Sequence, residues 1–93
     1  AIVSANNLMT IGVVSAIREA GLDIPDAVAV VGFDDFDWAE YFEPRLTVMA
    51  QPVQDIGLRA MKLLNKRIKT PDGPRQTVRL APTFIVRRSC GCA

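Results

Sequence analysis

The hydrophobic and polar positions of the first third of the chain predict a strand, a helix and a second strand. Residues 2–5 form a short apolar run, and residues 28–33 are continuously apolar and rich in β-branched side chains. The second run is typical of a parallel strand that is covered on both faces. Between the two runs, apolar side chains recur at helical spacing, at Met9, Val13, Ala16, Ile17 and Ala20. We therefore expect one right-handed βαβ unit.

Both ends of this helix carry sequence signals. Asn6 stands where an N-cap residue belongs, because its side chain can accept a hydrogen bond from the first turn. Gly21 stands where a left-handed residue ends a helix, and Leu22 can make the apolar contact that accompanies this cap. Pro25 then prevents helical continuation. The helix should therefore lie between Asn6 and Gly21.

The rest of the chain predicts a short strand over residues 46–50 and a helix that begins at Pro52. The apolar stripe of this helix consists of Ile56, Ala60, Leu63, Leu64 and Ile68. Basic side chains crowd its end, where they complement the helix dipole; a phosphate-binding face is the alternative. After a turn, Val78 and Leu80 alternate with polar neighbours and predict a half-buried strand, and residues 83–86 predict the last strand.

Composition places the chain among globular proteins and gives no charge-based indication of a partner. The chain has 93 residues, of which 49% are hydrophobic and 23% charged, and its formal net charge is +1. This balance gives no electrostatic reason to expect contact with nucleic acid or a membrane. No apolar stretch is long enough to cross a bilayer. Because residues 1–5 already read as a strand, we expect the chain to be a piece of a longer polypeptide.

The sequence contains little that could carry catalysis. It has no histidine, which removes the commonest general base and metal ligand. Ser4 lies at a strand end without a surrounding nucleophile elbow, and Gly32 alone does not make a phosphate loop. We expect no enzymatic activity and no cofactor. Cys90 and Cys92 supply at most two metal ligands, so a zinc site would need a further contribution; free tail thiols are the alternative.

Polar side chains stand directly after three predicted strands. Asn6 follows the first, Asp34 the second and Gln51 the third. If these strands are neighbours in one parallel sheet, the three side chains converge at the edge where ligands bind in such sheets. A carboxylate with two amides suits a ligand rich in hydroxyl or N–H groups, such as a sugar or a nucleoside. The alternative is that Asn6 only caps a helix and that Gln51 is only a first-turn residue.

Three residues that follow Asp34 bear on this candidate site. Asp35 is adjacent, so on an extended backbone the two carboxylates point in opposite directions and at most one faces a ligand. The other can cap the next turn. Trp38 and Tyr41 follow within residues 37–42, which we expect to form a short helical turn. Trp38 could stack on a sugar ring, or it could serve packing or a protein interface.

Several motifs, taken together, resemble one protein family. They are Ala5-Asn6-Asn7-Leu8-Met9, Gly21-Leu22-Asp23-Ile24-Pro25, Val30-Val31-Gly32-Phe33-Asp34-Asp35, Pro44-Arg45-Leu46-Thr47-Val48 and Gln51-Pro52. From residue 1 to about residue 88, the chain resembles the C-terminal part of the LacI/GalR bacterial transcription regulators. It resembles the related periplasmic sugar-binding receptors less closely.

The resemblance implies an α/β fold of the periplasmic-binding-protein-like type (type I), in which two lobes hold a small effector between them. Residues 1–50 would belong to the C-terminal lobe, residues 51–82 to the N-terminal lobe, and residues 83–93 to a return strand and tail. The chain would then be a partial effector-binding domain. It would contain a parallel sheet flanked by helices and a complete version of neither lobe.

The resemblance also implies effector contacts at matching positions. Asp34 is the first acidic residue of the Gly-aromatic-Asp-Asp motif, Asn6 is the Asn of an Ala-Asn-Asp motif, and Gln51 is the Gln before Pro. Asn7 and Arg45 depart from the family pattern, in which Asp and Pro are usual at these positions. The Ser-Cys-Gly-Cys ending is not typical of simple repressors, and it leaves a fused sensor protein open.

A regulator of this family binds a sugar or nucleoside-like effector that allosterically controls operator affinity. The resemblance therefore implies a cytoplasmic homodimer that contacts DNA only through an N-terminal headpiece, which is absent from these 93 residues. A piece of a transporter's periplasmic sugar receptor and a fused sensor are the alternatives. We further expect this chain to self-associate, because strands and helices without their neighbours expose pairing edges and apolar faces.

Overall fold

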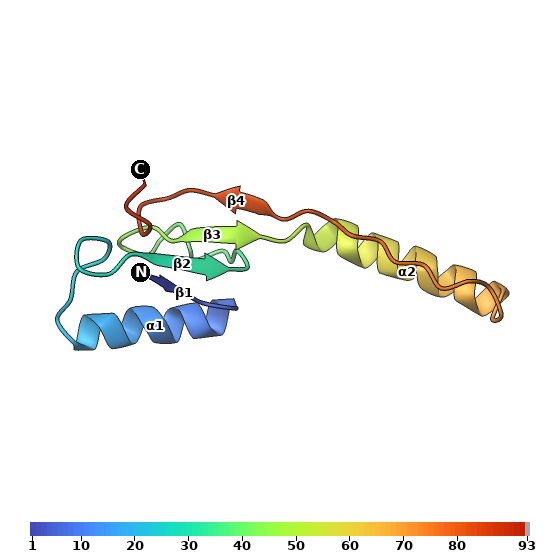
Figure 1. Ribbon diagram of the computed structural model, residues 1–93, viewed down its shortest axis with the longest axis horizontal. Helices are drawn as coiled ribbons and strands as arrows, with labels where there is room; N and C mark the ends of the chain where they lie inside the picture. Colours follow the sequence, from blue (N-terminus) through green and yellow to red (C-terminus); the bar gives the residue numbers. More distant parts are fainter. Residues whose placement is uncertain (93) are drawn as a thin grey trace. The chain divides into compact units, whose positions relative to one another are not determined.

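Two helices and four strands make up the computed structural model, which describes residues 1–92 (Figure 1). In chain order they are β1 (Ile2–Val3), α1 (Asn7–Glu19), β2 (Val30–Phe33), β3 (Thr47–Ala50), α2 (Val53–Lys69) and β4 (Thr83–Ile85). Each strand is shorter than the run that predicted it. Neither described helix has the length and hydropathy that crossing a bilayer requires.

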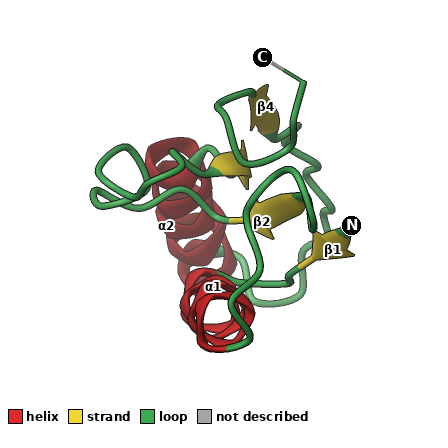
Figure 2. Cartoon of the chain, turned by 90° about the vertical axis from the view of Figure 1, so that its left-hand side faces the viewer, coloured by secondary structure: helices red, strands yellow, loops and turns green. Residues whose placement is uncertain are grey.

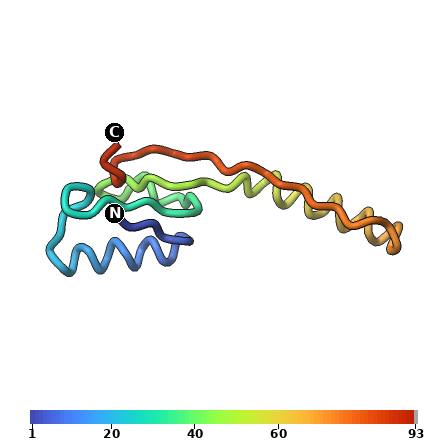
Figure 3. Tube along the Cα trace, in the orientation of Figure 1, coloured from blue at the N-terminus to red at the C-terminus, as the bar shows by residue number. Residues whose placement is uncertain are grey.

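The chain divides into two compact units. The backbone, traced in Figure 3, passes from the first unit into the second and then returns to the first. The first unit comprises Ala1–Gln51 together with the segment from Thr83 onward, and it contains the sheet and α1. The second unit, Pro52–Pro82, contains α2 and the segment that follows it.

The sheet of the first unit has the strand order β1-β2-β3-β4. β1 and β3 both pair in parallel with β2, so Val31 lies opposite Val3 on one side and opposite Thr47 on the other. β4 pairs antiparallel with β3. The strand, helix and strand of the first third therefore form the expected βαβ unit, with α1 lying along one face of the sheet (Figure 2). Because β1, β2 and β3 run the same way, their carboxyl ends meet at one edge.

The predicted signals at both ends of α1 are confirmed. The Asn6 side chain accepts a hydrogen bond of 2.9 Å from the Met9 amide, as an N-cap does. At the other end Gly21 adopts a φ of +69°, and the Leu22 amide donates to the Ile17 carbonyl at 3.1 Å. The left-handed glycine and this hydrogen bond identify a Schellman motif, which satisfies carbonyls that the helix leaves free.

The buried face of α1 is offset from the predicted stripe. Thr10, Val14 and Ile17 are buried, whereas Met9 and Ala20 are exposed. A polar residue takes the sheet-facing position because its hydroxyl is fully bonded there. Thr10 Oγ1 donates to the Asn6 carbonyl at 2.8 Å and also shares a hydrogen bond with the buried Ser4 hydroxyl. Apolar periodicity alone does not detect such a residue.

The core of the first unit lies between α1, the sheet and the loop that joins β2 to β3. Its buried members are Val14, Ala39, Leu46 and Val48, against which Ile24, Phe36, Phe42 and Ile85 pack. Residues 37–41 form turns, and the Phe42 amide donates to the Trp38 carbonyl at 3.2 Å, in agreement with the helical turn expected over residues 37–42. The rings of Phe36 and Phe42 meet edge to face with centroids 6.0 Å apart, an arrangement that aromatic pairs favour.

The segment after β4, residues 86–92, is anchored to the sheet; we call it the tail. Ser89 is fully buried, and its hydroxyl donates to the Val30 carbonyl at 2.6 Å while accepting from the Thr47 amide at 2.8 Å. The Val30 amide in turn donates to the Ser89 carbonyl at 2.8 Å. One serine thus satisfies backbone groups at the amino ends of both β2 and β3.

The second unit contradicts one predicted element. Val78 and Leu80 do not form a strand, because no strand within the described residues pairs with this segment. They line a hollow beside Ile56 and Leu63 of α2 instead. α2 is helical as predicted, but it has no buried residue, and much of its apolar stripe is exposed, including Ile68 at 67%.

Close packing of α1 on β2 should make Gly32→Ala costly. A Cβ at Gly32 would lie 2.9 Å from Thr10 Oγ1 and 3.3 Å from Val48 Cγ1, and the bonded Thr10 hydroxyl resists displacement. We expect the free energy of unfolding in urea to fall by about 1–3 kcal/mol. Gly12→Ala is the matched control, since nothing lies within 4 Å of its added Cβ. An equal effect of both substitutions would contradict this packing.

Candidate functional site

The carboxyl edge of the sheet brings Asp34 and Gln51 together. Asp34 follows β2 and Gln51 follows β3, and Phe33 lies opposite Met49 in the last rung of this strand pair. The Asp34 amide donates to the Met49 carbonyl at 2.8 Å. Beyond that rung, the Gln51 side-chain amide donates to the Asp34 carboxylate. Backbone pairing therefore positions both side chains at the predicted edge.

The backbone of Asp34 has an unusual conformation. Its φ of +75° is the single positive value among the described non-glycine residues. The left-handed region is sparsely populated outside glycine, although Asn and Asp enter it more readily than other residues. Strained backbone of this kind tends to cluster at functional sites. The turn holds the Asp34 carboxylate, which is half-buried, beside Gln51.

Asp35 has different partners, as its adjacency to Asp34 predicts. Its Oδ1 accepts from the Phe36 amide at 3.0 Å, so it caps the following turn. Both of its carboxylate oxygens accept from the Arg87 guanidinium, at 3.0 and 3.1 Å. The two neighbouring carboxylates therefore have separate partners, and Asp34 is the one that lies beside an amide at the sheet edge.

Asn6 lies at the same edge but serves as a cap. The Ser4 amide donates to the Val31 carbonyl at 2.9 Å, which places the start of α1 next to the end of β2. The Asn6 side-chain oxygen accepts from Met9, which leaves two amide N–H donors for other partners. No hydrogen bond within residues 1–92 joins Asn6 to Asp34 or Gln51.

Trp38 lies elsewhere in the unit. Its side chain is 67% exposed and lines a hollow with Arg18, Tyr41, Phe42 and Glu43. Arg18 is in the last turn of α1, about 18 Å along the helix axis from the Asn6 cap. Of the two uses proposed for Trp38, this position favours packing or a protein interface over stacking on a ligand at the strand ends.

Sequence reasoning missed Arg87, which connects the tail to the loop after Asp34. The Arg87 side chain is only 11% exposed. It binds Asp35 through both terminal nitrogens and donates to the Leu46 carbonyl at 2.9 Å. The antiparallel register of β3 and β4, in which Val48 lies opposite Ile85, places Arg87 beside Leu46. Register between distant strands was the signal required, and sequence periodicity does not supply it.

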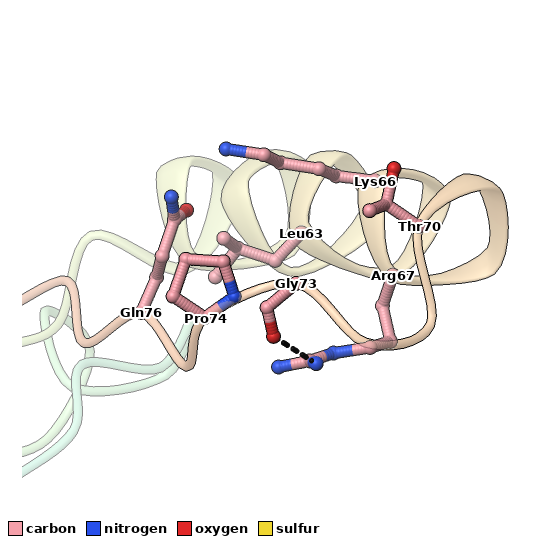
Figure 4. Close-up of a pocket in the computed structure, with 7 residues that line it drawn as sticks. All are labelled: Leu63, Lys66, Arg67, Thr70, Gly73, Pro74 and Gln76. Carbon is pink, nitrogen blue, oxygen red and sulfur yellow. Dashed lines mark hydrogen bonds between the residues drawn. The ribbon is translucent and has the colours of Figure 1, made fainter.

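A hollow of about 150 Å³ in the second unit contains basic side chains but has a structural use (Figure 4). Arg67 Nη1 donates to the Gly73 carbonyl at 2.7 Å and to the Pro71 carbonyl at 3.1 Å. These bonds hold the turn after α2 against the helix. They favour the helix-end interpretation of the basic cluster over a phosphate-binding face. Within the described part of the chain, no group of three or more side chains could hold a metal ion.

Comparison with known proteins identifies the class. Residues 1–90 match the family described as a periplasmic binding protein-like domain, and the chain belongs to that family. The parallel strands and the flanking helix are those of a partial domain of this fold.

Curated relatives are transcription regulators. The chain is 34% identical over 89 residues to the HTH-type transcriptional repressor PurR of Photobacterium profundum, covering 96% of this chain and 27% of that protein. It is 38% identical over 89 residues to the HTH-type transcriptional regulator KdgR of Bacillus subtilis, covering 96% and 26%. The chain therefore spans about a quarter of the length of these relatives.

Solved structures similar to this chain are also described as transcription regulators. A putative transcription regulator from Staphylococcus saprophyticus superposes with a TM-score of 0.87 at 39% identity, covering 96% of this chain and 32% of that one. A LacI family transcriptional regulator from Enterococcus faecium, solved with bound ribose, superposes with a TM-score of 0.81 at 34% identity, covering 94% and 33%. The expected resemblance to LacI-family regulators is confirmed.

Replacing Arg87 with Lys should destabilise the first unit, because an ammonium cannot reproduce the two-point contact with Asp35 and the bond to Leu46. We expect a loss of about 1–3 kcal/mol in the free energy of unfolding, measured by urea titration. Arg88→Lys is the control, because the Arg88 side chain is exposed, and it should change stability by less than about 0.5 kcal/mol. Equal stabilities of the two variants would show that the Arg87 contacts with Asp35 and Leu46 do not stabilise the unit.

Proposed function

We propose that this chain is the effector-sensing portion of a LacI-type bacterial transcription regulator, and that its effector binds at Asp34, Gln51 and Asn6. The observation that carries the proposal is the hydrogen-bonded Asp34–Gln51 pair at the carboxyl edge of the parallel strands. In open α/β sheets this edge is where ligands bind. Membership of the periplasmic binding protein-like family supports a binding role.

The chemistry of the pair supports a ligand rich in hydroxyl groups. A sugar or ribose hydroxyl can donate to the Asp34 carboxylate and accept from the Gln51 amide, replacing the bond between them. The free N–H donors of Asn6 add a third contact. The effector is therefore a sugar or a nucleoside-like molecule, a class consistent with the ribose bound in the Enterococcus faecium regulator.

Regulation follows from differential binding. An effector that prefers one of two conformations of the intact regulator shifts their populations by the ratio of its two affinities. In this proposal the shift changes operator affinity through a DNA-binding headpiece outside the 93 residues. In this proposal the intact protein is a cytoplasmic homodimer and not an enzyme. The Trp38 side chain, which is exposed in this chain, is one of its protein-contact residues. The lobe assignment of residues 1–50, 51–82 and 83–93 belongs to this proposal.

A periplasmic sugar receptor is the alternative that shares this binding site. The names of the relatives favour the regulator, because both PurR and KdgR are described as HTH-type transcriptional proteins.

Asp34→Asn in the intact protein should weaken effector binding with little change in fold. The substitution keeps the side-chain shape but removes the negative charge that strengthens hydrogen bonds from ligand hydroxyls. We therefore expect the affinity for the effector to fall by about 10- to 100-fold. Calorimetric melting with a panel of pentoses, hexoses, disaccharides and purine nucleosides measures this loss of affinity. At a ligand concentration near the wild-type Kd, the wild-type protein should show a ligand-induced rise in Tm that is nearly absent in the variant.

The matched control is Asp37→Asn, which removes an exposed carboxylate from the same loop. This variant should keep the full rise in Tm. A rise that survives in Asp34→Asn but disappears in Asp37→Asn would place the site in the loop and not at the sheet edge.

A further inference from the structure

Two cysteine thiols lie side by side in the tail. Gly91 between them has a φ of +72°, a conformation that lets the chain fold back over a single residue. The Cys92 amide donates to Cys90 Sγ at 3.2 Å, and the Cys92 thiol donates to the Cys90 carbonyl at 3.7 Å. Both cysteines are free. The left-handed glycine therefore holds Cys90 and Cys92 as an adjacent dithiol.

The anchored tail holds Cys90 in a fixed place. Ser89, immediately before it, is the buried serine bonded to both β2 and β3. Pro25 packs behind Gly91, since a Cβ on that glycine would lie 3.5 Å from the Cβ of Pro25. Cys90 is half-buried, whereas Cys92 is exposed. The two thiols thus differ in surroundings, with one fixed against the sheet and one accessible from solvent.

Hydrogen bonds favour the thiolate of Cys90. Burial raises the pKa of this thiol, but hydrogen bonds from the Cys92 thiol, the Thr47 hydroxyl and the Cys92 amide lower it by more, so the net pKa lies below the ordinary value. Thr47 Oγ1 accepts from the Arg87 amide at 2.9 Å, which leaves the Thr47 proton for the sulfur. The pKa of Cys92 is raised, chiefly by its hydrogen bond to Cys90.

We propose that Cys90 and Cys92 form a reversible redox site that reacts with low-molecular-weight disulfides of the glutathione class, Cys90 being the attacking thiol and Cys92 the resolving thiol. A structural zinc site fits less well, because two thiolates leave a tetrahedral ion two ligands short and the described residues place no third ligand beside them.

The reaction has two exchange steps. The Cys90 thiolate attacks one sulfur of the small disulfide, whose S–S bond breaks, and the departing thiolate takes up the proton that Cys90 released. The Cys92 thiol then loses its proton and attacks the Cys90 sulfur of the resulting mixed disulfide. The bond between Cys90 and the small thiol breaks, the Cys90–Cys92 bond forms, and the departing second thiolate takes up the proton from Cys92. Two protein thiols are oxidised and one disulfide is reduced to two thiols, so atoms and electrons balance.

Oxidation would change contacts that reach the candidate binding edge. In the reduced chain the Cys90 thiol donates to the Arg87 carbonyl at 3.7 Å, and the Thr47 hydroxyl favours the thiolate form of Cys90 by lowering its pKa. A bond to Cys92 removes both the contact with Arg87 and the thiolate. Arg87 also holds Asp35, the residue after Asp34. Arg87 therefore contacts both the Cys90 thiol and, through Asp35, the loop that carries Asp34.

The test exposes the purified full chain to increasing ratios of oxidised to reduced glutathione, blocks free thiols with iodoacetamide, and records intact and peptide masses. We expect the loss of two hydrogen atoms and a cross-linked peptide containing Cys90 and Cys92. Cys92→Ser should instead accumulate a glutathione adduct at Cys90. In Cys90→Ser, the adduct at Cys92 should form about tenfold more slowly at neutral pH.

Either of two results would overturn the proposal. One is that only intermolecular disulfides, separated on a non-reducing gel, form at every glutathione ratio. The other is that the two single-cysteine variants acquire their adducts at the same rate.

Gly91→Ala is a further variant, because a side chain disfavours the left-handed turn. Its intramolecular disulfide should require a glutathione ratio about tenfold more oxidising.

The pH dependence of alkylation gives a separate prediction. A thiol with a lower pKa is ionised at lower pH, so iodoacetamide should reach its half-maximal rate with Cys90 at a lower pH than with Cys92. Cys92→Ala removes a hydrogen bond that favours the thiolate, so the Cys90 profile should move to higher pH. A Cys90 profile that lies above that of Cys92 in the wild-type chain would contradict the assignment of roles.

Discussion

Parallel pairing of β2 with its neighbours is the constraint on which the other features depend. It sends the carboxyl ends of β1, β2 and β3 to one edge, and the bond from the Asp34 amide to the Met49 carbonyl continues the pairing beyond β2. Asp34 then turns into a left-handed conformation that places its carboxylate beside Gln51. Without this shared direction, residues separated by seventeen positions would have no reason to meet.

The same pairing defines an opposite edge, where the amino ends of β2 and β3 are bonded by Ser89. The tail, with its two thiols, is built onto that edge. Arg87 spans the two regions, because its amide bonds Thr47 at the start of β3 while its guanidinium holds Asp35 after the end of β2. A small sheet thus has a candidate ligand site at one edge and a candidate redox site at the other, with the half-buried Arg87 between them.

Local signals in the sequence predicted the parts of the fold that depend on neighbouring residues. Asn6 and Gly21 marked the ends of α1 because capping involves residues only a few positions apart. Asp34, Gln51 and Asn6 were predicted to converge on the condition that their three strands are neighbours in one parallel sheet, and β1, β2 and β3 are such neighbours. Whether these three bind an effector stays a proposal.

Features that depend on distant partners were not predictable in this way. Val78 and Leu80 alternate like a strand, but alternation does not supply a pairing partner, and these residues line a hollow of α2 instead. Thr10 is buried because Ser4, Asn6 and Gly32 surround it. The Arg87 contacts join residues up to 52 positions apart, so they follow from strand register and not from sequence pattern.

A crystal structure of the intact protein with an effector that raises its Tm would show directly whether Asp34 and Gln51 hold the ligand. We expect a ligand hydroxyl within hydrogen-bond distance of the Asp34 carboxylate, and the Gln51 amide bonded to the ligand in place of Asp34. A bound ligand that contacts neither Asp34 nor Gln51, with these two side chains still bonded to each other, would show that the effector site lies elsewhere.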